Sequence, residues 1–572
     1  MDTNRLLLIM GLFFVSFLIY QAWQKDFGPK QQSFQASGTP VQPADSTVGP
    51  APAGQPTTQT DGLPSPAEGQ TQSPPPVSAN AVSTQPGKLI RIKTDLYSMR
   101  INLNGGIIEG LKLLAYPLEQ GKLDKPFPLL DNQPPRVYMI KSGMIDAKRQ
   151  SLPLPGASFE ADKDRYDMGD KKELTVALTW EGENGLQVTK RFIFERGSYV
   201  VKVEHQVVNG ASGPWTGGTY VRIERDFVKK SGMLPTYKGA ALYSDEHKFE
   251  KIDFDDIKSY KSHHRSQIRK DIQHGWAAML EHYFVTAAIP DKDERVTYFT
   301  DTNYSEQNKD NNRYWVGLVT PQKRIEPKAD QTYAVRLYMG PKLQNVMVNV
   351  APGLELTVNY GILTVISDPL FWLMNWIHSW IGNWGWSIVF VTLIIKLLFY
   401  PLSAASYRSM AKMRTMTPKV QVLRERYADD RQKMSQAMMD LYRNEKINPL
   451  GGCLPIVIQI PVFLALYWVL LESVELRQAP WMLWIHDLST RDPYYILPIV
   501  MGGTMFLQQK LNPPQMDPTH QKIMQMLPII FTLFTAFFPS GLVLYWMANN
   551  LLSIAQQWMI TRQIEQASRK KT

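Results

Sequence analysis

The sequence predicts a multi-domain membrane protein in which a many-stranded β-sandwich precedes an α-helical membrane core, with an N-terminal anchor ahead of both. Three observations support this. A chain of 572 residues with a mean hydropathy of -0.24 is too long for one ordinary domain and too polar to lie in a membrane throughout. Apolar residues alternate with polar ones through the middle of the chain, and long apolar stretches occupy its last third.

The first 87 residues predict an anchor followed by a tether. Leu6 to Trp23 is almost continuously apolar and predicts a transmembrane signal anchor over 1–24. The main competitor is a cleaved signal peptide, but Tyr20 to Trp23 offers one small side chain where such a cleavage site needs two. Arg5 favours a cytoplasmic N-terminus. Residues 25–87 are rich in Pro, Gln and Ser, which predicts a disordered tether.

Period-two alternation predicts a β-sandwich domain over 88–352. The residues from Tyr97 to Leu103 alternate and run into the turn Asn104-Gly105-Gly106, which is typical of a hairpin. The same pattern recurs from Leu174 to Trp180, continues after a Gly-containing turn at Leu186 and Val188, and reappears from Tyr199 to Val207. Many strands of this kind favour a sandwich.

The last third predicts an interfacial amphipathic helix over 365–383 and a five-span core over 384–562. Tryptophans at helical spacing with polar residues between them indicate the helix, although an aromatic belt at the top of the next span is the alternative. The expected spans are 384–402, 454–471, 494–509, 523–538 and 541–560. Several are shorter than the roughly 20 residues that cross a bilayer, which predicts either local thinning of the membrane or deep snorkelling of flanking residues such as Lys510 and Lys522.

Charge sets the expected topology. A cytoplasmic helical hairpin at 404–447 carries many basic residues, and a short basic tail occupies 563–572, so both are expected inside by the positive-inside rule. Both termini are then cytoplasmic and the β-sandwich domain lies outside. The net charge of +10 is explained as topology and gives no independent case for sequence-specific nucleic-acid binding. The hairpin candidates are Arg408, Lys412, Arg414, Lys419, Arg424 and Arg426.

Lys396 is the principal candidate for function. It lies in the first span of the core, where an ammonium group is costly unless it faces water or protein. Snorkelling toward the boundary at Tyr400-Pro401 is the alternative. Thr392 is on the same helix face, and each later span adds polar residues, which favour a shared wet cavity although Ser and Thr also join helices. These polar residues are Gln459, Thr504, Gln508, Thr532, Thr535, Asn549, Asn550, Ser553 and Gln556.

Catalytic chemistry is not predicted. The sequence has no Walker loop and no Gly-x-Ser-x-Gly motif, and its histidines lack zinc-binding spacing, so we expect no cofactor, no metal and no enzymatic activity. Cys453 is the single cysteine, which excludes an intramolecular disulfide. Methionines from Met410 to Met439 suit a surface that accepts varied apolar sequences, with core filling as the alternative.

Six ordered motifs resemble the Gram-negative branch of the YidC/Oxa/Alb family of membrane insertases over about 360–562. They are Gly382-Asn383-Trp384-Gly385-Trp386, Tyr400-Pro401-Leu402, Asn448-Pro449-Leu450-Gly451-Gly452-Cys453, Gln459-Ile460-Pro461, Val474-Glu475-Leu476-Arg477 and Phe538-Pro539-Ser540-Gly541-Leu542. The resemblance implies an inner-membrane location, a periplasmic β-supersandwich related to sugar-binding enzymes, and a hydrophilic groove open to cytoplasm and lipid.

Lys396 matches the groove position where many family members carry arginine. The resemblance implies that substrate contacts Ile460, Pro461 and Phe463 on one span and Phe534, Tyr545 and Trp546 on others. It also implies nascent membrane proteins as clients, the phospholipid bilayer as surroundings, and the Sec translocon and translating ribosomes as partners. The expected function is membrane protein insertion and assistance in folding.

Two rival functions remain open at this point. A secondary transporter would also contain an intramembrane lysine and proline-broken spans, but the chain shows too few spans for two inverted halves and no internal repeat. A membrane-anchored sugar-binding or sugar-modifying protein would rest on the β domain, in which no catalytic set is recognised.

Overall fold

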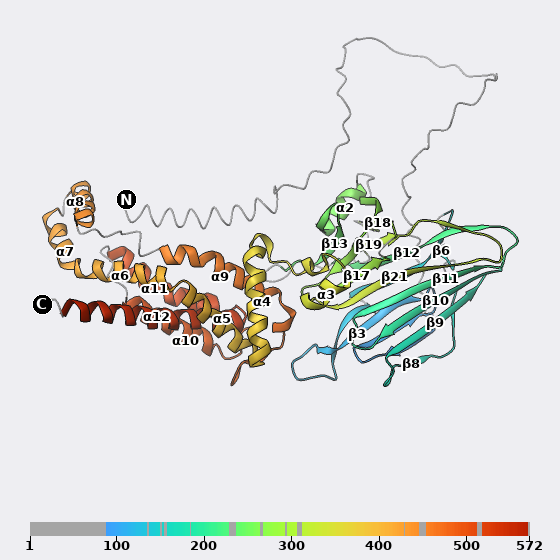
Figure 1. Cartoon of the computed structure of the whole chain (residues 1–572), viewed down its shortest axis with the longest axis horizontal. Coiled ribbons are helices and arrows are strands. Elements are labelled where there is room, and N and C mark those ends of the chain that lie inside the picture. Colours follow the sequence, from blue (N-terminus) through green and yellow to red (C-terminus); the bar gives the residue numbers. More distant parts are fainter. Residues whose placement is uncertain are drawn as a thin grey trace, which may run out of the picture. The chain divides into compact units, whose positions relative to one another are not determined.

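A computed structural model describes the β domain, the helical core and part of the basic segment 404–447 (Figure 1). The described residues are 87–133, 136–148, 151–153, 157–182, 185–227, 236–262, 267–291, 294–305, 312–427, 430–444, 454–511 and 518–569. The expected anchor at 1–24, the tether up to residue 86, Cys453 and the last three residues of the basic tail lie outside these ranges.

The β domain consists of two large sheets. The first has the order β15-β18-β19-β12-β5-β4-β3-β2-β1-β8, with β20 paired to β12 and β6 to β5. Its strands are β1 Leu89–Lys93, β2 Tyr97–Asn102, β3 Ile107–Pro117, β4 Pro126–Gln133, β5 Arg136–Asp146, β6 Ser151–Leu152, β8 Arg165–Asp167, β12 Trp215–Asp226, β15 Gln267–Ile272, β18 Val296–Thr302, β19 Arg313–Val319 and β20 Lys323–Ile325.

The second sheet has the order β14-β13-β16-β17-β21-β11-β10-β9-β7. Its strands are β7 Glu160–Ala161, β9 Glu173–Glu181, β10 Leu186–Glu195, β11 Val200–Asn209, β13 Gly239–Ser244, β14 Lys248–Ile252, β16 Trp276–Leu280, β17 Phe284–Pro290 and β21 Asp330–Pro341. Apolar side chains from both sheets form one continuous core between them, so the domain is a sandwich.

The alternation in the sequence matches the register of the strands. In the β9–β10 hairpin, Val176 pairs with Phe192 and Leu174 pairs with Phe194, and all four side chains are buried. The β2–β3 hairpin turns through Gly105 and Gly106, both of which have positive φ, a conformation that favours glycine. The predicted strands and hairpins are therefore confirmed at these positions.

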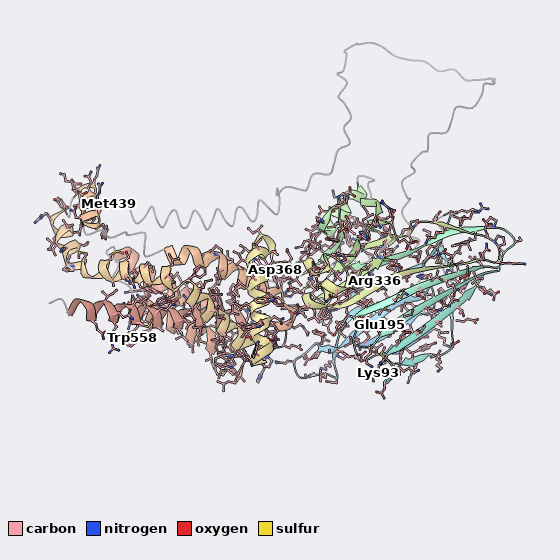
Figure 2. All side chains as sticks on the ribbon, in the orientation of Figure 1. Lys93, Glu195, Arg336, Asp368, Met439 and Trp558 are labelled. Atoms are coloured by element: carbon pink, nitrogen blue, oxygen red, sulfur yellow. The ribbon has the colours of Figure 1, made fainter. Side chains whose placement is uncertain are left out.

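All described helices except α2, which lies between β14 and β15, follow the last strand of the β domain in the sequence, and they form most of the last third of the chain (Figure 1). Those next to the sheets are α2 Phe254–Ser262, α3 Gln344–Val350, η2 Leu354–Thr357 and η3 Gly361–Leu363. The helical core consists of α4 Thr364–Ile381, α5 Trp384–Leu398, α6 Tyr400–Thr415, α9 Leu454–Glu472, η5 Val474–Leu476, α10 Ile496–Leu511, α11 Pro518–Thr535 and α12 Ser540–Arg569. Trp558 of α12 is exposed (Figure 2).

Helix α4 has one buried and one exposed apolar face. Phe371, Met374 and Ile377 are buried at helical spacing, and α4 packs against α5 and α9. Trp372 and Trp380 on its other side are 67% and 78% exposed. Large apolar side chains that remain exposed in this pattern mark a surface that contacts another apolar phase.

Membrane crossing by single helices is not evident from length and composition. Among the described residues, no single helix is long and apolar enough to span a bilayer. One bent pair, Trp384–Leu398 with Tyr400–Ala411, meets the criterion when the two helices are taken together, and their axes meet at 68°.

A separate unit contains α7 Thr417–Arg426 and α8 Arg431–Asn444. Asp430 stands directly before α8. Its carboxylate accepts hydrogen bonds from the backbone N–H groups of Gln432 and Lys433 at 3.1 and 3.0 Å, so it caps this helix. These bonds and the Lys433 ammonium lower the pKa of Asp430.

A fully buried lysine lies in the middle of the sandwich. The Lys190 ammonium donates to the carbonyl oxygens of Gly106 and Ser142 at 2.7 and 2.8 Å, so it connects β10 with the other sheet. Nearby, Thr219 donates to Gly143 O at 2.9 Å, and its oxygen lies 3.1 Å from His205 Nδ1. Because the threonine proton is already donated, Nδ1 of His205 must carry the proton in this bond. Burial lowers the pKa of Lys190 to about 7, and burial together with Lys190 lowers the pKa of His205.

We expect Lys190→Met to flatten the pH dependence of β-domain stability. Since the folded pKa of Lys190 is about 7 and the unfolded one is 10.5, the unfolded chain binds more protons between these values. The free energy of unfolding of the parent domain should therefore rise with pH from 7 to 10, by up to several kcal/mol. Denaturant unfolding of a fragment spanning 87–352 measures this rise. An equal rise in both proteins would contradict the assignment.

Candidate functional site

Lys396 is buried where α5 meets α12. Helix α5 begins at Trp384 because the side chain of Asn383 accepts a hydrogen bond from Trp386 N at 3.1 Å. Ile388, Thr392 and Lys396 follow at four-residue intervals, and all three are buried. This stripe faces inward, since α5 packs against α12 and α4. The side chain of Lys396 is therefore inside the helical core and does not extend to its surface.

One hydroxyl group is the hydrogen-bond partner of the Lys396 ammonium. Nζ donates to Ser553 Oγ on α12 at 2.7 Å, and Ser553 Oγ in turn donates to Asn549 O at 2.7 Å. Gln556 Nε2 donates to the backbone oxygen of Lys396 at 3.3 Å. Asn549, Ser553 and Gln556 recur at three- and four-residue intervals, so they form one polar stripe along α12 opposite α5.

The charge of Lys396 is not balanced by a carboxylate. Among the described residues, no charged side chain pairs with Lys396, whose ammonium group is buried in the helical core. Lys396 is 3% exposed. Thr392, although one turn away, donates its hydroxyl proton to Ile388 O at 2.7 Å and so is committed to its own helix. The ammonium group thus retains donor capacity that a carboxylate could use.

An aromatic cluster connects α9, α11 and α12 two turns from Ser553 along α12. The Phe463 and Trp546 rings are stacked with centroids 5.2 Å apart, and Phe463 also stacks on Tyr545 at 6.0 Å. On the α11 side, Phe531 lies 5.0 Å from Trp546. Phe538 links Phe534 to the cluster, with centroids 4.7 Å from Phe534 and 5.8 Å from Trp546. Three helices therefore share one aromatic surface.

The other candidates are more dispersed. Ile460 and Phe534 are 47% and 46% exposed, and Pro461 is also exposed. Gln459 on α9 and Gln508 on α10 are half-buried, and no hydrogen bond within the described part of the chain connects either to Lys396. Helix α6 carries Arg408, Lys412 and Arg414, and α7 carries Lys419, Arg424 and Arg426. These basic residues belong to helices other than those that form the Lys396 contacts.

Sequence reasoning recognised Ser553 and Gln556 as polar positions but did not pair them with Lys396. Their spacing from Asn549 was the available signal, because it places all three on one face of α12. Phe531 was not recognised, because a phenylalanine in an apolar helix resembles ordinary core or lipid-facing residues.

The loop between α9 and α10 is fastened to the start of α12. The buried Asp492 carboxylate accepts hydrogen bonds from Trp484 Nε1 at 3.1 Å and from Leu497 N at 2.7 Å, so it also caps α10. Ser540 N donates to Thr490 O at 2.7 Å, and Ser540 Oγ donates to Asp487 O at 2.8 Å. This loop therefore covers one end of the helical core.

Comparisons with known proteins cover nearly the whole chain. The family model described as YidC periplasmic domain matches residues 89–373, and the model described as 60Kd inner membrane protein matches 376–568. Membrane protein insertase YidC of Nitrosococcus oceani is 44% identical over 572 residues, which is 99% of this chain and 100% of that protein. The protein of the same name from Azotobacter vinelandii is 44% identical over 583 residues, with 99% and 100% covered. A crystal structure described as active YidC insertase has a TM-score of 0.38 and 16% identity, and the match covers 83% of this chain and 94% of that one.

Ser553→Ala should destabilise the helical core by about 1–3 kcal/mol, because it leaves the buried Lys396 ammonium without its hydrogen-bond acceptor. In a Lys396→Met background the same substitution should cost much less, since no charge then needs the hydroxyl. Thermal unfolding of the four proteins in nanodiscs completes the double-mutant cycle. Additive effects of the two substitutions would show that the two side chains do not interact.

Proposed function

This chain belongs to the YidC family of membrane protein insertases, and we propose that it inserts clients through a hydrophilic groove bordered by α5, α9, α11 and α12. The protein is an insertase of the inner membrane, where it assists integral membrane proteins. Its clients are nascent membrane proteins and its surroundings are phospholipid. Transfer of a chain from water to lipid forms and breaks no covalent bond, so its action is not enzymatic.

The unbalanced charge of Lys396 carries the proposal. A buried ammonium without a carboxylate partner attracts an incoming acidic or polar segment, because the interaction is stronger there than in water. The leading segment of a client pauses beside Lys396 while its following apolar helix contacts the aromatic cluster around Trp546. Lysine carries a positive charge but lacks the bidentate geometry of arginine, so the attraction is one of charge.

Short helices lower the energy barrier that a polar client segment meets when it crosses the bilayer. Helices α5, α10 and α11 have 15, 16 and 18 residues, which correspond to about 22, 24 and 27 Å at 1.5 Å per residue. These lengths are below the roughly 30 Å of a typical hydrocarbon core, so a bilayer that adapts to them becomes thinner. A thinner bilayer and water in the groove shorten the apolar path that a polar segment crosses, and no nucleotide hydrolysis is required.

The proposed topology follows the charge distribution. The β domain is periplasmic, both termini are cytoplasmic, and the basic α6–α8 segment faces the cytoplasm. In this arrangement α4 lies at the periplasmic surface of the inner membrane, with its exposed tryptophans in the lipid headgroup region. The basic cytoplasmic residues would contact translating ribosomes, and the Sec translocon would hand over or share clients that span the membrane several times.

Family membership argues against both rival functions. A secondary transporter and a membrane-anchored sugar-binding protein would each require relatives of those classes, whereas the relatives that match over the full length are named insertases. The β domain would then serve the insertase and not a separate sugar chemistry.

Photo-crosslinking tests the groove directly. A benzophenone amino acid at Phe463 or Phe534 should form adducts with a short single-span client on a stalled ribosome. The matched control is Leu398 on α5, which is 73% exposed and lies outside the proposed client path. Adduct yields that are equal at the three positions, or higher at Leu398, would exclude a groove between these helices.

Charge reversal at Lys396 tests the electrostatic part. Lys396→Glu should reduce insertion of clients with acidic leading segments about tenfold or more, which corresponds to roughly 1.4 kcal/mol, and should affect matched clients with neutral segments less. Lys396→Arg, which retains the charge, should insert both kinds. Protease protection of each client in vesicles measures insertion. If both client kinds decline equally in Lys396→Glu, attraction of acidic segments is not the function of this charge.

A further inference from the structure

The turn between β16 and β17 contacts two different parts of the molecule. Glu281 faces the interior of the β domain, whereas His282 and Phe284 face the helical core. The helical residues on the other side are Leu471 and Glu472 at the end of α9 and Arg477 and Gln478 just after it. We call these contacts the α9 joint.

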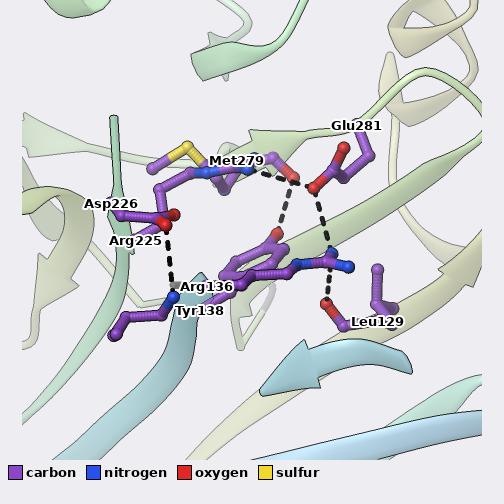
Figure 3. Close-up of polar contacts among 8 residues, drawn as sticks. Leu129, Arg136, Tyr138, Arg225, Asp226, Met279 and Glu281 are labelled. Atoms are coloured by element: carbon purple, nitrogen blue, oxygen red, sulfur yellow. Dashed lines mark hydrogen bonds and ion pairs between the residues drawn. The ribbon is translucent and has the colours of Figure 1, made fainter. Parts of the chain in front are cut away.

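Two arginines hold Glu281 from within the β domain (Figure 3). Arg225 Nη2 lies 3.1 Å from Glu281 Oε1, and Arg136 Nη2 lies 3.3 Å from the same oxygen. Arg225 is 1% exposed and lies over the Tyr138 ring at 4.8 Å, and Tyr138 donates to Met279 O at 3.2 Å. A buried and charge-paired residue at the base of the turn fixes the direction in which the turn leaves the sheet.

Hydrogen bonds and ring stacking continue from this turn into the helical core. His282 Nε2 donates to Leu471 O at 2.9 Å. Arg477 Nη2 and Gln478 Nε2 both donate to Pro117 O, at 2.7 and 3.0 Å. The Arg477 guanidinium lies 5.6 and 5.7 Å from the centroids of Phe127 and Phe284, whose rings stack on each other at 4.4 Å. Arg477 is thus bound by both a carbonyl and an aromatic pair.

Opposite charges also alternate across the α9 joint. Lys342 is 3% exposed. Its ammonium group is attracted electrostatically by the carboxylates of Glu472 on α9 and Glu281 in the β domain. Burial lowers the pKa of Lys342, and these two carboxylates oppose that change. Separation of the two parts would remove the carboxylate of Glu472 from the surroundings of this buried lysine, which is costly because each charge is left with fewer partners.

We propose that the α9 joint fixes the β domain to the C-terminal end of α9, so that the domain and the helical core move as one body. Helix α9 also carries Phe463, which stacks on Trp546, near the middle of the same helix. The β domain is then a brace that sets the position of α9. This inference concerns the architecture of the resting protein and does not depend on the proposed path of the client.

Distance measurements between spin labels test the α9 joint in the full chain. Labels are placed at the exposed positions Glu195 of β10 and Ile499 of α10, in a Cys453→Ser background in nanodiscs without client. The parent should give one narrow distance distribution. Arg477→Ala combined with Gln478→Ala should at least double its width, because both donors to Pro117 O and the stacked cation are removed.

Arg491→Ala is the matched control, since Arg491 is an exposed arginine of the same loop outside the α9 joint, and it should leave the width unchanged. If the double variant does not accumulate, His282→Ala, which removes the bond to Leu471 O and leaves Arg477 and Gln478 in place, should still broaden the distribution. A broad distribution in the parent, or one as narrow in the joint variants as in the parent, would overturn the proposal. Client insertion is not measured, so failure of the groove hypothesis would leave this result unaffected.

Discussion

A buried ammonium group with one hydroxyl partner is the constraint on which the helical core depends. Burial of an isolated charge costs several kcal/mol even after relaxation, and one hydrogen bond to a charged group returns roughly 1.5–3 kcal/mol. The bond from Lys396 to Ser553 therefore offsets only part of the cost. The deficit favours any arrangement that supplies water or a carboxylate at this point, and in the proposed mechanism an acidic leading segment of a client supplies the carboxylate.

Two of the buried lysines, Lys190 and Lys396, differ in what their hydrogen-bond partners permit. Lys190 in the β domain donates to two backbone carbonyls on the opposite sheet, and these acceptors cannot rotate away. Lys396 donates to a serine side chain, which can change its rotamer and release the ammonium. The first arrangement suits a permanent connection between sheets, and the second suits a charge that changes its partner during a working cycle.

Local patterns in the sequence predicted the elements but not their long-range contacts. The alternation around Val176 predicts a strand and its buried face, and the apolar stretch containing Lys396 predicts a helix with a polar position inside. The contacts of the α9 joint join residues as far apart as Pro117 and Arg477, and no periodicity specifies such a pair. In the sequence, Arg477 is noticeable only as part of the motif Val474-Glu475-Leu476-Arg477. The pairing of Ser553 with Lys396 likewise depends on how two helices that are distant in the sequence pack together.

The loop fastened by Asp487, Asp492 and Ser540 bears on the energetics of the cell. A groove that admits water to the middle of an energised membrane would conduct protons if it were open at both ends, and the gradient that drives ATP synthesis would dissipate. In the proposed topology this loop lies on the periplasmic side, where hydrogen bonds from Ser540 to the backbone oxygens of Asp487 and Thr490 hold it against the start of α12. The protein can then hydrate half of the bilayer thickness while the electrical insulation of the membrane is retained across the other half.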